Sequence, residues 1–222
     1  VIFSKGWCFV WGIVSLISAP FIGVAGNIGV GKTTFTEYVA KNFGWRDYYE
    51  SVIDNPYLKD FYKNMDRWSF NLQIYFLQHR FSNHIKMAES NCGVIQDRTI
   101  YEDVEIFARN LFEMKLMTKR DWETYFSLFL NMDRFLKRPN LIIYLQASTD
   151  TLVNRINNRN RDFEKNIDVE YLHRLNIFYE RWISKVVNIP ILTVNTDNFN
   201  IFTDYRRLDD IYSQILKKLD DD

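Results

Sequence analysis

The chain has 222 residues, of which 47% are hydrophobic and 17% aromatic. This length and apolar content are typical of one globular domain with a sizeable core. Its 28 basic residues balance its 28 acidic residues, which argues against a polymeric nucleic-acid partner, since a basic surface usually binds such partners. Two cysteines and three scattered histidines exclude a disulfide framework, argue against a zinc site and favour a reducing compartment.

Residues 1–19 need an interpretation of their own. One charged residue, Lys5, precedes a long apolar run, which is the outline of a signal peptide. The run is also apolar enough to suggest a membrane span, but its continuation matches the first strand and loop of a folded domain. We interpret residues 1–19 as an extension that adds nothing to the chemistry and that a mis-assigned start would explain, with an export signal as the alternative. Residues 20–222 then form one domain.

Short apolar runs alternate with longer helical patterns along that domain. Such alternation is typical of an α/β fold whose parallel sheet is covered on both faces. Spacings of three and four predict one apolar helix face made of Phe70, Ile74, Leu77, Phe81 and Ile85. The runs that predict strands are residues 21–25, 45–49, 94–96, 141–145 and 191–194.

A glycine-rich turn follows the first predicted strand and opens a helix. It matches G-x-x-x-x-G-K-[ST] in full, in the strand–turn–helix context that the motif requires. Its glycines let backbone N–H groups point at phosphate oxygens, its lysine reaches the β- and γ-phosphates, and its threonine offers a hydroxyl to Mg²⁺. We predict that the chain binds a nucleotide through Gly26, Asn27, Ile28, Gly29, Val30, Gly31, Lys32, Thr33 and Thr34.

Two large classes of phosphate-loop proteins find no support in the sequence. A GTPase switch needs D-x-x-G after the loop, but the later glycines, Gly44 and Gly93, have no aspartate three positions before them. An ABC-type ATPase signature also needs glycines that the chain lacks. These absences favour a small-molecule kinase, in which helices and arginines close around the substrate.

Two polar stretches after the loop fit the acceptor side of a kinase site. Glu50 ends the second predicted strand, where a carboxylate can take the proton of an attacking hydroxyl. Gln73 and Arg80 lie seven residues apart, two helical turns, and so project from one face. An amide and a guanidinium on one wall can read the edge of a base. Taken singly, Glu50 could equally be a surface glutamate, and Gln73 and Arg80 could lie on the solvent-exposed side of a helix.

Two further stretches fit the phosphate side of the same site. Asp97 and Arg98 end a buried strand, at the sheet edge where open α/β folds bind their ligands. Arg155, Arg159 and Arg161 cluster at a helix end and in the loop that follows. We interpret the three arginines as a basic lid over phosphates, and a solvated charge run is the plainer alternative.

In this order and spacing, these stretches resemble the deoxyribonucleoside kinase family over residues 21–199. The resemblance implies a P-loop NTPase-like three-layer α/β fold, in which helices flank a five-stranded parallel sheet and an arginine-rich lid covers the site. The features that fall where the family has them are the phosphate loop, Glu50, Tyr62, the Trp68–Arg80 helix, the Asp97-Arg98-Thr99 triplet and the lid.

The resemblance implies a role for each matching position. Glu50 becomes the general base for the 5′-hydroxyl of a deoxyribonucleoside, and Lys32 and Arg98 complete the catalytic group. Asp97 and Thr33 hold Mg²⁺, and the three lid arginines join the ATP site. The residues implied for substrate binding are Glu50, Tyr62, Gln73, Arg80, Arg98, Asp103 and Glu164.

The resemblance also implies which nucleobase the enzyme prefers. The Arg80–Asp103 pair resembles that of members that accept deoxycytidine or purine deoxynucleosides, and Asn55-Pro56-Tyr57 is similar to a stretch in deoxyadenosine and deoxyguanosine kinases. We expect a purine deoxynucleoside, with a deoxycytidine-preferring kinase as one alternative. A thymidylate-like nucleoside monophosphate kinase is the nearest other enzyme, and a non-catalytic nucleotide-binding regulator is the alternative from another class.

The resemblance also bears on setting and assembly. We expect a cytoplasmic enzyme of nucleotide salvage, because its ATP is cytosolic, with no membrane and no polymeric nucleic acid as partner. A homodimer is expected through long helices such as residues 121–136.

Overall fold

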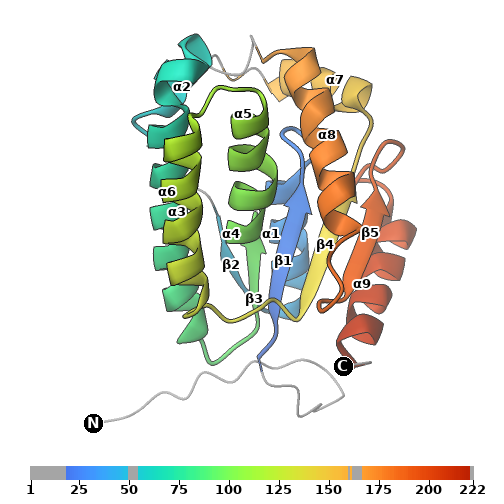
Figure 1. Ribbon diagram of the computed structural model, residues 1–222. Helices are drawn as coiled ribbons and strands as arrows, with labels where there is room; N and C mark the ends of the chain where they lie inside the picture. Colours follow the sequence, from blue (N-terminus) through green and yellow to red (C-terminus); the bar gives the residue numbers. More distant parts are fainter. Residues whose placement is uncertain (1–18, 50–54, 160, 162–166, 221–222) are drawn as a thin grey trace.

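The computed structural model describes residues 19–49, 55–159, 161 and 167–220. Its centre is a five-stranded sheet in the order β2-β3-β1-β4-β5, and every neighbouring pair of strands is parallel (Figure 1). Each predicted strand is confirmed to within one residue at either end. The strands are β1 (Phe21–Gly26), β2 (Arg46–Tyr48), β3 (Val94–Asp97), β4 (Leu141–Gln146) and β5 (Ile191–Asn195).

Helices connect the strands and cover both faces of the sheet. None of them, within the described ranges, is long and apolar enough to cross a membrane. The helices are α1 (Lys32–Phe43), α2 (Leu58–Lys63), α3 (Met65–Ala88), α4 (Ile100–Glu102), η1 (Asp103–Ala108), α5 (Arg109–Glu113), α6 (Lys119–Asp133), α7 (Thr149–Arg159), α8 (Val169–Ile183) and α9 (Tyr205–Asp220).

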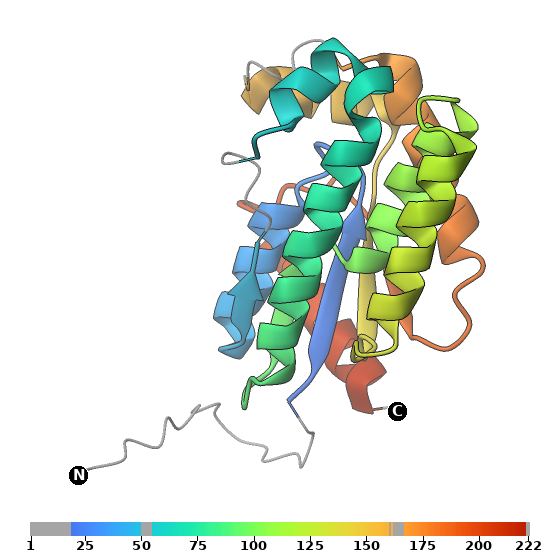
Figure 2. The same ribbon diagram turned by 60° about the vertical axis from the view of Figure 1, so that its left-hand side comes forward.

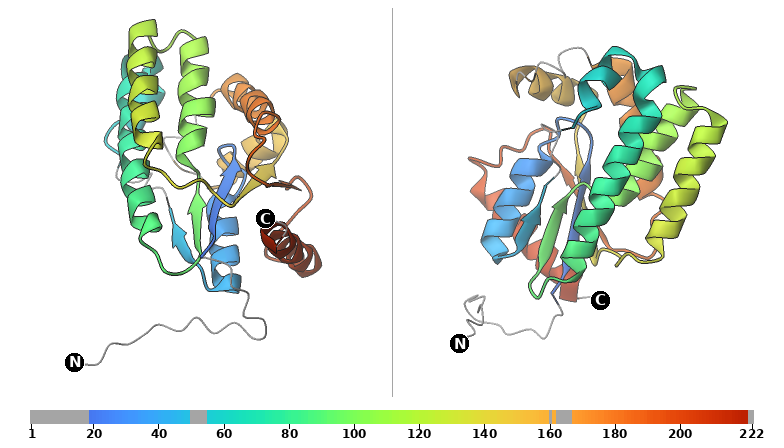
Figure 3. Two further views of the ribbon diagram at one scale, coloured as in Figure 1. Left: turned by 60° about the horizontal axis from the view of Figure 1, so that its bottom comes forward. Right: turned by 90° about the vertical axis from the view of Figure 1, so that its left-hand side faces the viewer.

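The helices form a layer on each side of the sheet. Helices α1 and α9 lie on one face, and α3, α5, α6 and α8 lie on the other (Figures 1 and 3). On the first face, Ile22 of β1 packs in one core with Val39 of α1. On the second, Ala25 of β1 shares a core with Leu77 of α3 and Tyr125 of α6. Because both faces are covered, all six residues of β1 are buried, and the predicted three-layer fold is confirmed.

Strand order decides where a ligand can bind. Strand β1 lies between β3 and β4, so the chain continues to one side of β1 for β2 and β3 and to the other side for β4 and β5. Open α/β sheets bind ligands outside the carboxyl ends of the strands at such a switch point. The phosphate loop follows β1 at this place, and Figure 2 shows α2 and α7 at the same end of the molecule.

The inner face of α3 differs from the predicted apolar face. Leu77 is buried as predicted, but Ile85 is 37% exposed, and Phe70, Ile74 and Phe81 are only partly buried. The prediction was wrong in part because the buried side of α3 also forms the wall of a polar site, so amide and guanidinium groups share it with apolar ones. The buried residues of α3 are Ser69, Leu72, Gln73, Phe76, Leu77, Arg80, His84 and Met87.

The stretch after β3 contains a feature that the sequence pattern did not indicate. Helices α4 and α5 are joined through η1, a π-helix that begins at Asp103. Wide turns of this kind are rare and are frequent at functional sites. Here the wide turn lies directly after Glu102, in the segment that follows Asp97 and Arg98.

Candidate active site

A cavity of about 1030 Å³ opens at the carboxyl ends of the strands. Its described walls come from the phosphate loop, α2, α3, the end of β3, α7, α8 and residues 196–202 after β5. Glu50 and Glu164 lie outside the described residues, and Arg80 and Asp103 are not among the described residues that line the cavity. The predicted residues that it brings together are Ile28, Gly29, Val30, Gly31, Lys32, Thr33, Thr34, Tyr62, Gln73, Asp97, Arg98, Arg155, Arg159 and Arg161.

The phosphate loop has the backbone that its glycines predict. Gly29 has a φ of 86° and Gly31 a φ of 102°, conformations that other residues rarely adopt. A Cβ atom on Gly29 would lie 2.8 Å from Cγ1 of Ile156. Lys32 opens α1, and its Nζ donates to the carbonyl oxygens of Gly26, at 2.8 Å, and Asn27, at 3.0 Å. Its ammonium therefore lies over the loop at a helix N-terminus, where phosphate groups bind.

Two side chains anchor the loop to the rest of the domain. Asn27 donates through Nδ2 to the carbonyl oxygen of Leu172 in α8, at 2.9 Å. Arg155 donates through Nη1 to the carbonyl oxygen of Val30 and to Oγ1 of Thr196, both at 3.0 Å. The sequence predicted Arg155 as a lid residue over phosphates. In the structure it also ties the phosphate loop to the segment after β5.

A hydroxyl and a carboxylate meet at the mouth of the loop. Oγ1 of Thr33 donates to Oδ2 of Asp97 at 2.6 Å, so the end of β3 lies directly against the start of α1. Hard oxygen donors of this kind are the ligands that Mg²⁺ prefers. The two residues predicted to hold the metal are therefore adjacent and suited to it.

Arg98 occupies an unusual backbone position beside this pair. Its φ is 65°, in the left-handed region, which is uncommon for a residue with a side chain. Its backbone N–H donates to the carbonyl oxygen of Val24 at 3.0 Å. The guanidinium lies 4.2 Å from the ring centroid of Phe107, a cation–π contact. These contacts hold a positive charge at the cavity wall.

The wall across from the loop combines one amide with apolar side chains. Gln73 is 2% exposed, and its Oε1 has no hydrogen-bond partner within the described part of the chain. Tyr62 is partly buried and lines the same cavity. The apolar side chains that line this wall are Leu58, Phe61, Leu72 and Phe76. Such a wall suits a flat, uncharged ligand that offers a hydrogen-bond donor to the amide.

Arg80 and Asp103 form a buried ion pair behind this wall. Their side chains are 4% and 1% exposed, and Nε of Arg80 donates to Oδ2 of Asp103. Nη1 of Arg80 also donates to the carbonyl oxygen of Arg98 at 3.1 Å. The pair predicted for substrate binding is thus present, and it supports the backbone of Arg98.

Sequence reasoning missed several described residues of the cavity wall. Phe107 of η1, Tyr171 of α8 and Leu145 of β4 line it. Apolar spacing indicates that a residue is buried but not that its buried side faces a cavity. Only the order of the strands brings these three segments to one place.

A family model described as deoxynucleoside kinase matches residues 22–220. The chain belongs to the deoxynucleoside kinase family. This kinase is 38% identical over 202 residues to a deoxyadenosine/deoxycytidine kinase of Bacillus subtilis (strain 168), and the match covers 90% of this chain and 93% of that protein. It is 42% identical over 184 residues to a deoxyadenosine kinase of Dictyostelium discoideum, with 82% of this chain and 75% of that protein covered.

Solved structures support the same assignment. A deoxyadenosine kinase from M. mycoides, with the products dCMP and a flexible dCDP bound, matches with a TM-score of 0.76 and 30% identity, over 88% of this chain and 99% of that one. The same enzyme with dATP bound also matches with a TM-score of 0.76. The P-loop NTPase-like fold is confirmed, and the chain is an enzyme that phosphorylates deoxynucleosides.

Proposed function

We propose that this kinase transfers the γ-phosphate of ATP to the 5′-hydroxyl of a purine deoxyribonucleoside, in nucleotide salvage in the cytoplasm. One observation carries the acceptor: the buried Oε1 of Gln73, which lines the cavity and has no partner within the described residues. A buried acceptor left unpaired costs about 1–3 kcal/mol. A ligand that offers an N–H group at this point, as a nucleobase does, removes that cost.

On the acceptor side, the nucleoside lies along the α3 wall with its 5′-hydroxyl toward the phosphate loop. We assign base contact to Gln73 and sugar contact to Tyr62, both of which line the cavity. We also propose that Glu164 binds the 3′-hydroxyl of the sugar and that Glu50 is the general base. These two assignments rest only on the positions of the residues in the sequence. A carboxylate within reach of the 5′-hydroxyl accepts its proton as the oxygen attacks the phosphorus.

On the donor side, cationic groups surround the phosphates. Lys32, Arg98 and the lid residues Arg159 and Arg161 lie around one cavity, where fixed positive charges stabilise the charge that develops on the transferred group. Thr33 and Asp97 would hold Mg²⁺, which would neutralise part of the charge of the phosphates. Closure of the arginine-rich segment over the site would exclude water, a competing acceptor.

The purine preference rests on relatives and on the second layer of the wall. Relatives with 42% and 37% identity are a deoxyadenosine kinase and a deoxyguanosine kinase. Deoxycytidine is the alternative, because the relative from Bacillus subtilis acts on both deoxyadenosine and deoxycytidine by its description. The buried Arg80–Asp103 pair lies behind the Gln73 wall, and its resemblance to the pair in members that accept deoxycytidine or purine deoxynucleosides is compatible with either base.

We further propose that two copies assemble through α3 and α6. Both helices carry large apolar side chains at the surface: Ile85 on α3 is 37% exposed, and Leu128 on α6 is 36% exposed. Covering such side chains is favourable by about 25 cal/mol per Å² of apolar area. A second copy of the same surface would cover both helices at once.

Initial rates with ATP and Mg²⁺ on each of deoxyadenosine, deoxyguanosine, deoxycytidine and thymidine test the substrate assignment. We expect the highest kcat/KM with a purine deoxynucleoside. Glu50→Gln should lower kcat by at least about 10²-fold, the loss of a general base, and Glu37→Gln, on the outer helix α1, should leave it unchanged. A Glu50→Gln enzyme with wild-type kcat would show that Glu50 is not the general base. Thymidine as the best substrate would contradict the proposed preference for purine nucleobases.

A further inference from the structure

Glu102 is a buried carboxyl that the reaction scheme above does not use. It lies five residues after Asp97, in the first turn of the helical stretch that follows β3, and it is 0% exposed. Buried carboxyls are rare unless they are paired or bonded. The position of Glu102, between the phosphate loop and the turn that carries Arg98, raises the question of what it holds in place.

One oxygen of Glu102 fixes the residue next to Arg98. Oε2 accepts the backbone N–H of Thr99 at 2.7 Å and lies 3.3 Å from Oγ1 of the same residue. Together they form a capping box, in which the side chain of Thr99 also bonds back to the turn. Arg98, with its left-handed backbone, is therefore followed directly by Thr99, which makes two contacts with Glu102.

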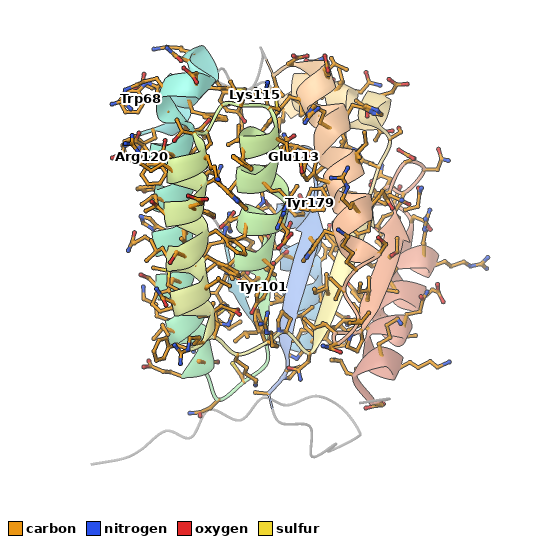
Figure 4. All side chains as sticks on the ribbon, in the orientation of Figure 1. Trp68, Tyr101, Glu113, Lys115, Arg120 and Tyr179 are labelled. Carbon is orange, nitrogen blue, oxygen red and sulfur yellow. The ribbon has the colours of Figure 1, made fainter. Side chains whose placement is uncertain are left out.

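The other oxygen reaches the phosphate loop. Oε1 accepts the backbone N–H of Gly26, at 3.3 Å, and lies 2.8 Å from the hydroxyl of Tyr179. That hydroxyl lies 2.7 Å from the carbonyl oxygen of Gly26, the oxygen that also accepts from Lys32. Tyr179 comes from α8, on the side of that helix that faces the sheet (Figure 4). Both backbone groups of Gly26 thus bond to one pair of side chains.

The number of protons along this chain of oxygens is informative. Oε1 of Glu102, the hydroxyl of Tyr179 and the carbonyl oxygen of Gly26 make two contacts, of 2.8 and 2.7 Å, and each contact of this length needs a hydrogen between its oxygens. Tyr179 supplies one hydrogen and a carbonyl supplies none. The second hydrogen must come from the carboxyl of Glu102.

The surroundings of Glu102 agree with a neutral carboxyl. Complete burial raises the pKa of Glu102, and the nearby positive charges of Arg98 and Lys32 act in the opposite direction. Burial, with Glu102 beside it, also raises the pKa of the Tyr179 hydroxyl well above its ordinary value. Tyr144, which stacks on Tyr179, acts in the same direction on the pKa of Tyr179.

We propose that Glu102 and Tyr179 are a positioning pair for phosphoryl transfer, in which a protonated Glu102 bonds to Tyr179 and the two side chains together hold Gly26 of the phosphate loop at a fixed distance from Thr99 and Arg98. The donor phosphates bind to the loop, and Arg98 is one of the cations that we assign to the transferred group, so this pair sets the distance between the loop and that cation. Reaction rates are sensitive to such alignment, since a displacement of about 1 Å can cost about 10²-fold.

Removal of one hydroxyl tests the pair. Tyr179→Phe keeps the ring but breaks the bonds to Gly26 and Glu102. Tyr144→Phe is the matched control: its ring stacks on Tyr179 at 5.7 Å, and its hydroxyl donates instead to Oε1 of Glu180 at 2.9 Å. We expect Tyr179→Phe to lower kcat by about ten- to a hundredfold and to weaken ATP binding in calorimetry without acceptor, with Tyr144→Phe near wild type in both. Equal kcat and equal ATP affinity in the two variants would overturn the proposal.

Two substitutions at Glu102 test its proton. The side-chain amide of Glu102→Gln can donate to Tyr179 as the protonated carboxyl does and accept from the N–H of Thr99, and it loses only the long 3.3 Å contact with the N–H of Gly26. We therefore expect this variant to keep most of kcat and the wild-type pH profile. Glu102→Ala breaks the connection and should resemble Tyr179→Phe. A folded Glu102→Gln enzyme as slow as Glu102→Ala would show that a charged carboxylate is required, which contradicts the assignment.

The inference rests on the proposed function, and the measurements separate the two. If the wild-type chain phosphorylates no nucleoside, the proposed acceptor falls. The ATP affinities of the two Tyr→Phe variants then still decide whether Tyr179 positions the phosphate loop.

Discussion

The guanidinium of Arg80 is buried, and it bonds to the carboxylate of Asp103 and to the carbonyl oxygen of Arg98. Arg98 has a φ of 65°, and a backbone in this region stores about 1–3 kcal/mol of strain unless its surroundings hold it. The bond from Arg80 is one of the contacts that do so. The residue predicted to select the base therefore also supports the residue predicted to act at the phosphate.

Substitutions at this ion pair test the double role. Arg80→Met removes the guanidinium that bonds to the buried carboxylate of Asp103, so we expect the free energy of unfolding to fall by up to about 3–5 kcal/mol. The double variant Arg80→Met/Asp103→Ala removes both charges and should be more stable than the single variant. Chemical denaturation of the two proteins measures this difference. A single variant as stable as the wild type would show that the pair is not desolvated in solution.

The site residues that sequence reasoning found are those whose chemistry is local. The phosphate loop is one contiguous motif, so the amino-acid sequence alone is enough to name its glycines, Lys32 and Thr33. Arg155 bonds to Val30, 125 residues away in the sequence, and Tyr179 bonds to Gly26, 153 residues away. Nothing in the spacing of a single helix indicates such long-range partners, so these roles needed the fold.

At the level of elements, burial pattern explains what could be predicted. Strands β1 and β4 are buried almost along their whole length because helices cover both faces of the central sheet, and this made them easy to find. The edge strand β2 is short, polar and mostly exposed, so its pattern was weaker. Helix α3 was harder, because its buried side carries Gln73, Arg80 and His84 among apolar residues. A helix that forms one wall of a polar site is an exception to the rule that the buried face of a helix is apolar.

His84 makes the attachment of α3 to the sheet dependent on pH. Its ring packs edge-on against Phe21 of β1 at 4.9 Å, and its Nε2 lies 2.8 Å from the carbonyl oxygen of Lys137. Nε2 therefore donates there, while Nδ1 is buried with no hydrogen-bond partner within the described residues. Burial lowers the pKa of His84 from its ordinary value of 6.5, and the charge of Arg138 lowers it as well. The hydrogen bond to Lys137 and the charge of Asp133 raise the pKa, but by less than burial lowers it.

The sign of the pH effect follows from this shift. The unfolded chain binds a proton at His84 more readily than the folded chain, so the stabilising contribution is fully present above about pH 6.5 and is lost as the pH falls toward the lower folded-state pKa. We expect His84→Gln to lose less unfolding free energy than the wild type between about pH 7.5 and about pH 5.5, a range that spans the ordinary pKa. His79→Gln, at an exposed position of α3, is the control and should keep the wild-type dependence. Identical curves for all three proteins would contradict the role of His84.

At the scale of the whole molecule, the layers assign separate tasks to the two faces of the sheet. Helices α1 and α9 close one face, and the opposite layer builds the acceptor wall through α3 and η1 (Figure 1). The outer sides of α3 and α6 expose the apolar residues that we assign to a dimer. The sequence predicted the three layers, but the faces of α3 could be assigned only in the structure.

The dimer is tested by mass in solution. A chain of 26.7 kDa should elute with light scattering at twice that mass, and Leu128→Glu should shift it toward the single mass, because a buried unpaired charge is costly at an apolar interface. Leu216→Glu, at an exposed apolar position of α9 on the opposite layer, is the matched control and should leave the mass unchanged. A wild-type protein of single mass at micromolar concentration would contradict the assembly.

We propose above all that the acceptor is an uncharged deoxynucleoside that lies along the Gln73 wall and faces the phosphate loop. The most direct measurement gives the full-length chain γ-labelled ATP and Mg²⁺ with either deoxyadenosine or deoxyadenosine monophosphate as acceptor, and follows where the label goes. We predict labelled deoxyadenosine monophosphate from the nucleoside and no labelled diphosphate from the monophosphate. Labelled diphosphate together with an unreactive nucleoside would contradict the account and make the chain a nucleoside monophosphate kinase.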